Sequence, residues 1–377
     1  MKKVKSFVTC LFVLISISLF SAAGTSCYAN SSNQQLMIFP QDLSTLQSDL
    51  STLKNGDDLY LEIYELDDPA IESTLLTLAN NGVKIFIVCN NFAKPSAREG
   101  YILNHEKEFG KNYDITVYPS TDKFDLTHSK TFTAFNNLTQ TPIFSIIMTA
   151  NLIDDSQAPV SQTWNSSIDF ALYTTDPNIE SETKSIINED ITNSEQSTKD
   201  TPSLSAESGN SITGLVVSPV NSMSKLENLI NSAQSSIYIY MENITETNLL
   251  DDLANKAEDG VAVKVLAEDS IVFGKDWNKT RISALYSEYD SNNEFHSNMN
   301  VILAQDPNNY IHAKVVVVDN RYVYIGSINM SDNSINNDRE IGIIIDNPQI
   351  AKKIVAKFNT DWAYFSNNYK YYYPYQS

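Results

Sequence analysis

The chain has 377 residues, 42% of them hydrophobic, and a formal net charge of −20. A chain of this length and apolar content can bury the cores of two domains. Nucleic-acid binding usually depends on lysine and arginine that neutralise several phosphates, so the acidic balance disfavours a nucleic acid as the partner.

The N-terminus has the pattern of a secretory signal peptide. Three lysines within the first five residues precede an apolar run over residues 7–20, and small residues follow at 21–23. The run is shorter than the roughly 20 residues of an ordinary membrane-spanning helix. We therefore predict a signal peptide over residues 1–29 and a secreted or periplasmic protein.

Removal of this segment takes away three lysines and no acids, which changes the net charge from −20 to −23. A lipid-modified Cys27 is the alternative, which we disfavour because the usual leucine three positions earlier is missing. After processing, Cys89 remains alone, so a disulfide within the chain is not expected.

An internal duplication organises the rest of the chain. Residues 58–88 align with residues 236–266 at an offset of 178 without a gap, and Asn151 and Asn329 keep the same offset. Each copy has the pattern of a strand, an amphipathic helix, a Gly-Val turn and a second strand. A strand–helix–strand unit of this length predicts a right-handed crossover and parallel pairing.

The stretch between the copies contains few apolar residues and indicates a polar linker over residues 191–210. We therefore predict a first domain over residues 30–190 and a second over residues 211–377. The expected fold class is α/β, with two pseudo-symmetric domains that each contain a mixed β-sheet flanked by helices.

Both halves carry a histidine, a lysine, an asparagine and an acid in the same order. The second half has His312-Ala-Lys314 with Asp319 five residues on, then Gly326-Ser327-Ile-Asn329, then Glu340; the first half has His128-Ser-Lys130, Asn151 and Asp169. Residues 312–318 alternate on β-branched side chains and predict a strand, in which residues i and i+2 share a face. We therefore expect the histidine and lysine of each half to project together and the two pairs to converge on one pocket.

These residues resemble the signature of the phospholipase D superfamily, HxKxxxxD followed by GSxN and a downstream acid. The duplicated segments extend the resemblance over the whole mature chain and identify it as a secreted bacterial phospholipase D-like protein. The resemblance implies an enzyme that hydrolyses a glycerophospholipid, such as phosphatidylcholine, to phosphatidic acid and a free head group. It also implies a site without metal or cofactor, because two lysines supply the positive charge.

By this resemblance, His128 attacks phosphorus and forms a covalent phosphohistidine. His312 protonates the departing alkoxide and then helps to activate the water. The two lysines and two asparagines hold the nonbridging oxygens, and Asp169 and Glu340 each orient an imidazole. Asp319 and Ser327 are expected to support the site.

The first half departs from the signature at three places. Phe135 stands where an aspartate is expected, Thr149-Ala150 replaces Gly-Ser, and Asp169 is one methylene shorter than the usual glutamate, which would weaken its hold on His128. The missing aspartate matters least, because a residue five positions past Lys130 has the opposite strand parity and points away from the phosphate. We therefore expect activity.

Two other functions share these residues: a metal-independent nuclease of the same superfamily, and a catalytically degenerate protein that binds phosphate ligands. A nuclease should show clustered basic residues near the site, but its flanking segments contain only Lys123, Arg321 and Arg339. We therefore expect a phospholipid at a membrane surface as the partner, with nucleic acid disfavoured. A monomer should suffice, because one chain carries both halves of the site.

Overall fold

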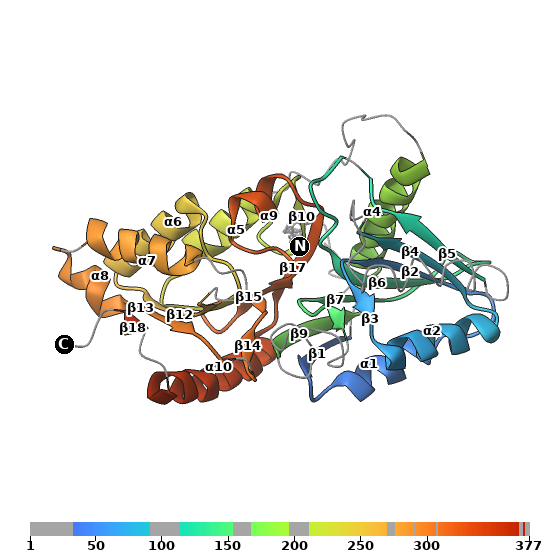
Figure 1. Ribbon diagram of the computed structural model, residues 1–377, viewed down its shortest axis with the longest axis horizontal. Coiled ribbons are helices and arrows are strands. Elements are labelled where there is room, and N and C mark those ends of the chain that lie inside the picture. The colour runs from blue at the N-terminus through green and yellow to red at the C-terminus, as the bar shows by residue number, and fades with distance from the viewer. Residues whose placement is uncertain are drawn as a thin grey trace, which may run out of the picture. The chain divides into compact units, whose positions relative to one another are not determined.

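The computed structural model describes residues 33–90, 114–121, 123–153, 167–195, 211–269, 276–289, 291–306, 308–368 and 372–373. The signal peptide predicted over residues 1–29 lies outside these ranges. Residues 32–377 form one compact unit, whose elements are labelled in Figure 1. Within the described residues, no helix combines the length and the apolar character needed to cross a membrane.

The first half of the unit forms a mixed sheet with the strand order β1-β9-β7-β6-β2-β4-β5. Strands β2, β4 and β5 run parallel, and the pairs from β2 to β1 run antiparallel. The strands are β1 (Gln34–Phe39), β2 (Asp57–Ile63), β4 (Lys84–Cys89), β5 (Ile115–Pro119), β6 (Lys130–Asn136), β7 (Pro142–Met148) and β9 (Ser167–Thr174), with a separate pair of β3 (Leu66–Asp67) and β8 (Leu152–Ile153). The helices are α1 (Leu43–Leu50), α2 (Pro69–Asn80) and α4 (Pro177–Glu195).

The second half repeats this arrangement, with the strand order β10-β17-β16-β15-β11-β12-β13-β18. Its strands are β10 (Gly214–Ser218), β11 (Ser236–Met241), β12 (Ala262–Glu268), β13 (Met299–Ala304), β14 (Tyr310–Ile311), β15 (Lys314–Val318), β16 (Tyr322–Gly326), β17 (Glu340–Asp346) and β18 (Tyr372–Tyr373). Its helices are α5 (Ser222–Asn231), α6 (Thr247–Glu258), α7 (Trp277–Glu288), α8 (Asn293–Asn298), α9 (Asp332–Asn336) and α10 (Pro348–Asn368). The predicted fold class, two mixed sheets flanked by helices, is confirmed.

The duplicated sequence gives the same local structure twice. The parallel register starts at Asp58 with Lys84 in the first half and at Ser236 with Ala262 in the second. The turn into the second strand uses a glycine with φ of +87° in both halves, Gly82 and Gly260, a backbone conformation that other residues rarely adopt.

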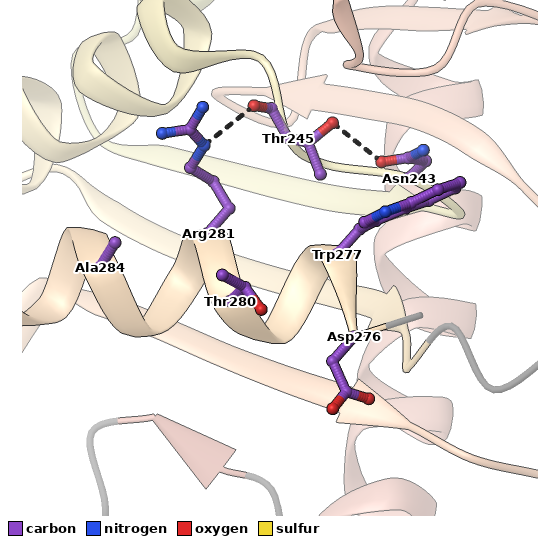
Figure 2. A pocket seen from close by; sticks show the side chains of 7 residues that line it. All are labelled: Asn243, Thr245, Asp276, Trp277, Thr280, Arg281 and Ala284. Atoms are coloured by element: carbon purple, nitrogen blue, oxygen red, sulfur yellow. Dashed lines mark hydrogen bonds between the residues drawn. The ribbon is translucent and has the colours of Figure 1, made fainter. Parts of the chain in front are cut away.

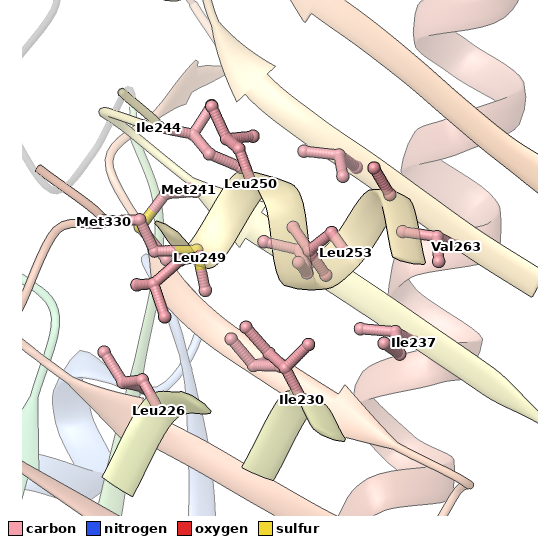
Figure 3. Packing of buried hydrophobic residues seen from close by; sticks show 14 of the residues in the cluster. Leu226, Ile230, Ile237, Met241, Ile244, Leu249, Leu250, Leu253, Val263 and Met330 are labelled. Atoms are coloured by element: carbon pink, nitrogen blue, oxygen red, sulfur yellow. The ribbon is translucent and has the colours of Figure 1, made fainter. Parts of the chain in front are cut away.

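The apolar stripe of α6 shows why this unit is a helix packed on a sheet. Leu249, Leu250 and Leu253 recur at helical spacing and are buried. They belong to one cluster with Ile237 of β11 and Val263 of β12, and Figure 3 shows α6 lying over these strands. Each buried leucine contributes about 1.5–3 kcal/mol of transfer free energy, so this face anchors the second half.

A separate apolar cluster joins the two halves. It contains Ile147 of β7 and Phe170 of β9 from the first half, together with Leu215 of β10 and Ile341 of β17 from the second. A buried ion pair also crosses between the halves: Arg339 Nε lies 2.8 Å from an oxygen of Asp190 on α4, and both side chains are at most 2% exposed.

Helix α4 continues to Glu195, so residues 191–195 of the predicted polar linker are helical. The reason is that Ile186 and Ile187 on α4 are buried, and tertiary packing therefore stabilises a helix that its polar composition does not favour. Residues 196–210 of the linker lie outside the described residues, and the domain boundaries remain a prediction.

Candidate active site

Each histidine follows a short backbone segment that pairs with the other half of the chain. Strand β14, which ends one residue before His312, pairs in parallel with β9 of the first half. In the first half, Thr127 forms a parallel bridge with Arg339, and the backbone N–H of His128 donates to the Arg339 carbonyl at 2.8 Å. Both crossings place a histidine next to the start of an acid-bearing strand in the opposite half.

The acids consequently hold the histidines crosswise. Asp169 Oδ1 lies 2.9 Å from His312 Nδ1, and Glu340 Oε2 lies 2.9 Å from His128 Nδ1. The expectation that Asp169 holds His128 is therefore wrong. The shorter aspartate side chain reaches its imidazole at the same distance as the glutamate, because parallel pairing of β14 with β9 brings the two backbones together.

The strands begin at the lysines and not at the histidines. Strand β15 starts at Lys314 and β6 starts at Lys130, whereas the histidines lie in the irregular segments just before them. The crossing into the other half ends the regular pairing there. Each lysine turns back along the chain, and its Nζ donates to the histidine carbonyl two residues earlier, at 2.6 Å for Lys314 and 2.7 Å for Lys130.

The two lysines are fully buried. Burial lowers the pKa of Lys130 to about 7, with a further lowering by the nearby charge of Lys314. An incoming anion would reverse this shift, because a negative charge beside an ammonium group favours its charged form. Lys130 is thus suited to bind a phosphate oxygen.

The pair of His128 and Glu340 tends toward its neutral state. Burial, with the charges of Lys130 and Lys314, lowers the pKa of the His128 imidazole well below its usual value. Burial also raises the pKa of the Glu340 carboxyl to about 8. The Nδ1 atom of His128 is occupied by this contact, which leaves Nε2 as the ring nitrogen available for chemistry.

The environment of Asp169 differs. Burial raises the pKa of its carboxyl, but the neighbouring His312 ring outweighs this effect, so the net pKa is below the usual value. Thr149 and Ser167 also donate their hydroxyl groups to the two oxygens, each at 2.5 Å. An ionised Asp169 can stabilise a positive charge on His312.

Thr149 is the counterpart of Ser327. The expectation that Thr149-Ala150 replaces Gly-Ser is therefore wrong by one residue, because Met148-Thr149 corresponds to Gly326-Ser327. With the offset of 178, threonine and serine occupy the same position, and each hydroxyl accepts from the backbone N–H one residue past the acid, that of Phe170 or Ile341. The first half therefore retains the supporting hydroxyl.

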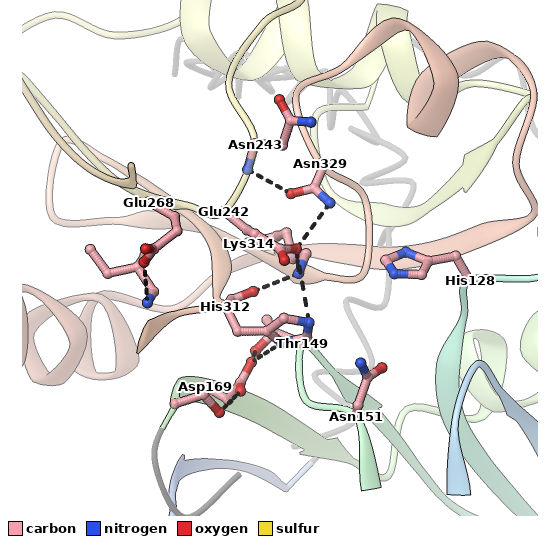
Figure 4. A network of polar contacts seen from close by, with 12 residues as sticks. His128, Thr149, Asn151, Asp169, Glu242, Asn243, Glu268, His312, Lys314 and Asn329 are labelled. Atoms are coloured by element: carbon pink, nitrogen blue, oxygen red, sulfur yellow. Dashed lines mark hydrogen bonds and ion pairs between the residues drawn. The ribbon is translucent and has the colours of Figure 1, made fainter. Parts of the chain in front are cut away.

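Each asparagine donates to a carboxylate, and the two carboxylates lie just past the ends of β2 and β11. Asn151 Nδ2 donates to Glu65 Oε2 at 3.1 Å, and Asn329 Nδ2 donates to Glu242 Oε2 at 3.3 Å. Asn329 also accepts from the backbone N–H of Asn243 at 3.0 Å. Figure 4 shows His128 and Asn151 facing the network of the second half.

Asp319 supports the fold at a distance from this network, as its strand parity predicted. Its carboxylate accepts from the backbone N–H groups of Gln234, Ser235 and Ser236 at 2.8–3.0 Å, where β11 begins. In the first half, Phe135 occupies the corresponding position and is buried, with Lys184 Nζ 4.3 Å from its ring centre. The missing aspartate therefore leaves the site itself unchanged.

The histidines and asparagines line a cavity of about 580 Å³. Its remaining wall is mainly aromatic and acidic. The lining includes the aromatic residues Tyr64, Trp277 and Tyr310, the acids Glu65, Glu242, Glu268 and Asp338, and the four site residues His128, Asn151, His312 and Asn329.

A second hollow of about 450 Å³ adjoins this cavity and shares Asn243 and Trp277 with it. Figure 2 shows Trp277 and Arg281 on α7 facing Thr245 in the segment after β11. Arg281 Nε donates to the Thr245 carbonyl at 3.2 Å, and Trp277 is 43% exposed. The cavity therefore has an open, partly aromatic rim.

The sequence analysis missed Glu242, Tyr64 and Tyr310. The offset of 178 pairs Tyr64 with Glu242 at the ends of two equivalent strands, which marked the position without showing its role.

Within the described residues, no group of three histidine, cysteine or acidic side chains is arranged to hold a metal ion.

Comparisons with known proteins agree with this site. The family profile "Cardiolipin synthase, PLD-like domain" matches residues 226–362. Cardiolipin synthase 2 of two Staphylococcus epidermidis strains is 30% identical over 125 residues, which is 31% of this chain and 25% of that protein. The chain thus spans about a quarter of the length of this relative.

Two solved structures share the fold. Phosphatidylserine synthase of Haemophilus influenzae matches with a TM-score of 0.62 at 14% identity, over 87% of this chain and 85% of that one. Polyphosphate kinase of Porphyromonas gingivalis matches with a TM-score of 0.58 at 15% identity, over 87% of this chain and 50% of that one. Residues 226–362 thus match a PLD-like domain, and the fold of the chain is shared with these two structures.

Proposed function

We propose that this protein is a secreted phospholipase D that hydrolyses a glycerophospholipid, such as phosphatidylcholine, to phosphatidic acid and a free head group. One observation carries the proposal: two imidazoles line one cavity, and each is held at Nδ1 by a carboxylate of the other half. Residues of both halves complete the site, so a monomer suffices at a phospholipid surface.

The contacts support a two-step reaction. His128 Nε2 attacks phosphorus, and the new N–P bond replaces the P–O bond to the head group. The departing oxygen takes a proton from His312 Nε2. A water molecule then gives a proton back to His312 as its oxygen attacks phosphorus, and the N–P bond breaks to regenerate His128.

The surroundings of the two rings support this division of roles. The pKa of His128 is lowered by burial and the two lysines, which favours the neutral imidazole that a nucleophile needs. Asp169, whose lowered pKa keeps it ionised, occupies Nδ1 of His312, which leaves Nε2 as the nitrogen available to donate a proton.

The cavity wall favours a lipid with a cationic head group over a nucleic acid. Apart from the buried site lysines Lys130 and Lys314, the described lining adds no lysine or arginine, and its acids would repel a chain of phosphates. Trp277 lines the cavity and is 43% exposed, and an exposed aromatic ring can attract an ammonium group, with an affinity gain of about 0.5–2 kcal/mol. Burial raises the pKa of Glu268 to about 9, and a bound cation would favour its ionised form.

Transfer to an alcohol is a second candidate. The matching family profile names cardiolipin synthase, and its curated relative carries the same name. A phosphohistidine can be resolved by either water or an alcohol, so both reactions would use the same residues. The choice depends on which acceptor enters the cavity.

Residues 30–377, purified and incubated with phosphatidylcholine vesicles, test the proposal by choline release, with glycerol added in one arm to detect transfer. His128→Ala and His312→Ala should each abolish release, whereas His296→Ala, a histidine on α8 outside the cavity, should retain it. A covalent adduct that forms in His312→Ala but not in His128→Ala would support the assigned nucleophile.

Plasmid DNA in a parallel assay tests the nuclease. Strand breakage without lipid cleavage would contradict the lipid proposal, as would choline release that survives in either site variant. Binding of phosphate esters without any turnover would make the protein a degenerate binding member. Secretion is tested by expression of the full chain: the proposal requires cleavage near residue 29 and recovery of the product outside the cytoplasm.

A further inference from the structure

The carboxylate of Glu242 lies among the groups that the proposed function gives to the phosphate. Its Oε2 atom is 2.6 Å from Lys314 Nζ, 3.3 Å from Asn329 Nδ2 and 3.8 Å from His312 Nε2. Figure 4 shows Glu242 between Asn329 and His312, on the side of the network that faces His128. One negatively charged side chain therefore contacts three groups suited to bind an anion.

The side chain of Glu242 is held in this position. Tyr310 donates its hydroxyl to the other carboxylate oxygen, Oε1, at 2.8 Å. Burial raises the pKa of the Glu242 carboxyl, but Lys314 and His312 outweigh it and lower the pKa far below its usual value. The carboxylate is therefore ionised at neutral pH.

In the first half a tyrosine stands at the equivalent position, and the neighbouring Glu65 accepts from Asn151 as Glu242 accepts from Asn329. The register that pairs the two strand ends places Tyr64 opposite Glu242, and Lys130 Nζ lies 5.0 Å from the centre of the Tyr64 ring. Lys314 thus has a carboxylate partner at ion-pair distance, whereas Lys130 contacts an aromatic ring and a backbone carbonyl. Lys314 therefore shares its charge with a carboxylate at ion-pair distance, whereas burial keeps the pKa of Lys130 at about 7.

We propose that Glu242 is a specificity-determining residue that makes the site prefer singly charged phosphodiesters to doubly charged phosphomonoesters. This inference rests on the proposed function, because it takes His312, Lys314 and Asn329 as phosphate ligands. A phosphate that enters the site must share Lys314 with the Glu242 carboxylate. The repulsion between them scales with the charge of the ligand, and it is twice as large for a dianion as for a monoanion at the same position.

The preference has a consequence for turnover. The substrate of the proposed reaction is a diester with one negative charge, and its product is a monoester whose second pKa is about 6. The product therefore gains a charge when it forms at neutral pH. Glu242 would weaken its binding and promote its release, and the enzyme would resist inhibition by phosphatidic acid and by free phosphate.

Direct binding tests this without any need for turnover. Methyl phosphate, a dianion at pH 8, and dimethyl phosphate, a monoanion, are titrated calorimetrically into the wild type and into Glu242→Gln. The variant should bind methyl phosphate about tenfold more tightly or better, the order expected from the loss of one nearby charge, with a smaller gain for dimethyl phosphate. Asp259→Asn removes the same charge from a side chain that is 69% exposed, and it should change neither affinity.

Each outcome decides the matter. An equal gain for both ligands, or no gain, would overturn the role of Glu242 and leave the proposed function standing. Failure of both ligands to bind either protein would remove the phosphate site itself, and the proposed function with it. If Glu242→Gln does not fold, the wild type alone is decisive, because a tenfold preference for methyl phosphate over dimethyl phosphate would contradict the proposal.

Discussion

The ion pair between Arg339 and Asp190 should contribute far more to stability than a similar pair on the surface. Two nitrogens of Arg339 lie 2.8 and 3.1 Å from the two oxygens of Asp190. Arg321 and Asp346 also pair through two nitrogens and two oxygens, with hydrogen bonds of 2.9 and 2.6 Å, whereas the Nε–Oδ2 contact of the buried pair is close without being aligned as a hydrogen bond. The pairs differ in burial, because the exposed fractions are 0% and 2% in the first pair and 55% and 37% in the second.

This difference in burial sets the expected magnitudes. At about 3 Å and an effective dielectric constant of about 20, the attraction of the buried pair is about 5 kcal/mol before desolvation is counted. Removal of one partner leaves a buried charge uncompensated, which typically costs about 3–5 kcal/mol. An exposed pair contributes about 0–1 kcal/mol. Asp190→Asn should therefore lower the free energy of unfolding by about 3–5 kcal/mol, and Asp346→Asn by less than about 1 kcal/mol.

Glu62 complicates the single variant. Its carboxyl is fully buried, and burial together with the charge of Asp190 raises its pKa well above the usual value. When Asp190 loses its charge, Glu62 can ionise and partly compensate Arg339. The double variant Glu62→Gln/Asp190→Asn removes this alternative, so it should show the larger loss.

Urea unfolding followed by circular dichroism measures these differences, with the m-value checked for each variant. The ion pair joins α4 of the first half to the residue before Glu340, so the same variants should also lower turnover, because Glu340 positions His128. The reasoning is refuted if the double variant and Asp346→Asn lose the same free energy of unfolding.

Three further predictions follow from single contacts. Asp319→Asn should lower the free energy of unfolding by about 1–2 kcal/mol, because the bonds from Ser235 and Ser236 N–H become neutral and the bond from Gln234 N–H to the second oxygen is lost. Turnover should stay within about twofold, and a large loss of turnover would place Asp319 in the chemistry after all. Burial raises the folded-state pKa of Glu268 from 4.5 to about 9, so the folded protein holds the proton of this carboxyl more tightly than the unfolded chain does. The contribution of Glu268 to the free energy of unfolding is therefore fully present below pH 4.5 and is lost as pH rises toward 9. Glu268→Gln should accordingly stabilise the protein more at pH 8.5 than at pH 5.5, and equal effects in urea unfolding at the two pH values would contradict the shift. EDTA should leave the hydrolysis of a water-soluble phosphodiester unchanged, because Lys130 and Lys314 supply the positive charge; inhibition reversed only by a divalent ion would disprove this.

Much of the fold follows from the sequence because the signals are local. Within each of the segments 58–88 and 236–266, the strand and helix patterns follow one another inside 31 residues. They therefore predicted two parallel strand–helix–strand units, which the registers of β2 with β4 and β11 with β12 confirm. The order of histidine, lysine, asparagine and acid likewise named the side chains of the site. Strand parity also predicted that the residue five positions past Lys130 points away from the phosphate.

The tertiary structure alone decided how these side chains are combined. His312 and Asp169 are 143 positions apart, and His128 and Glu340 are 212 apart; pairing over such separations leaves no periodic trace in either segment. The crossed backbone pairing determines which acid holds which histidine, and it also makes the lysines the first residues of β6 and β15. Similarly, Glu242 looked like one more residue at the end of a strand, and only the folded chain brings its carboxylate to Lys314, His312 and Asn329.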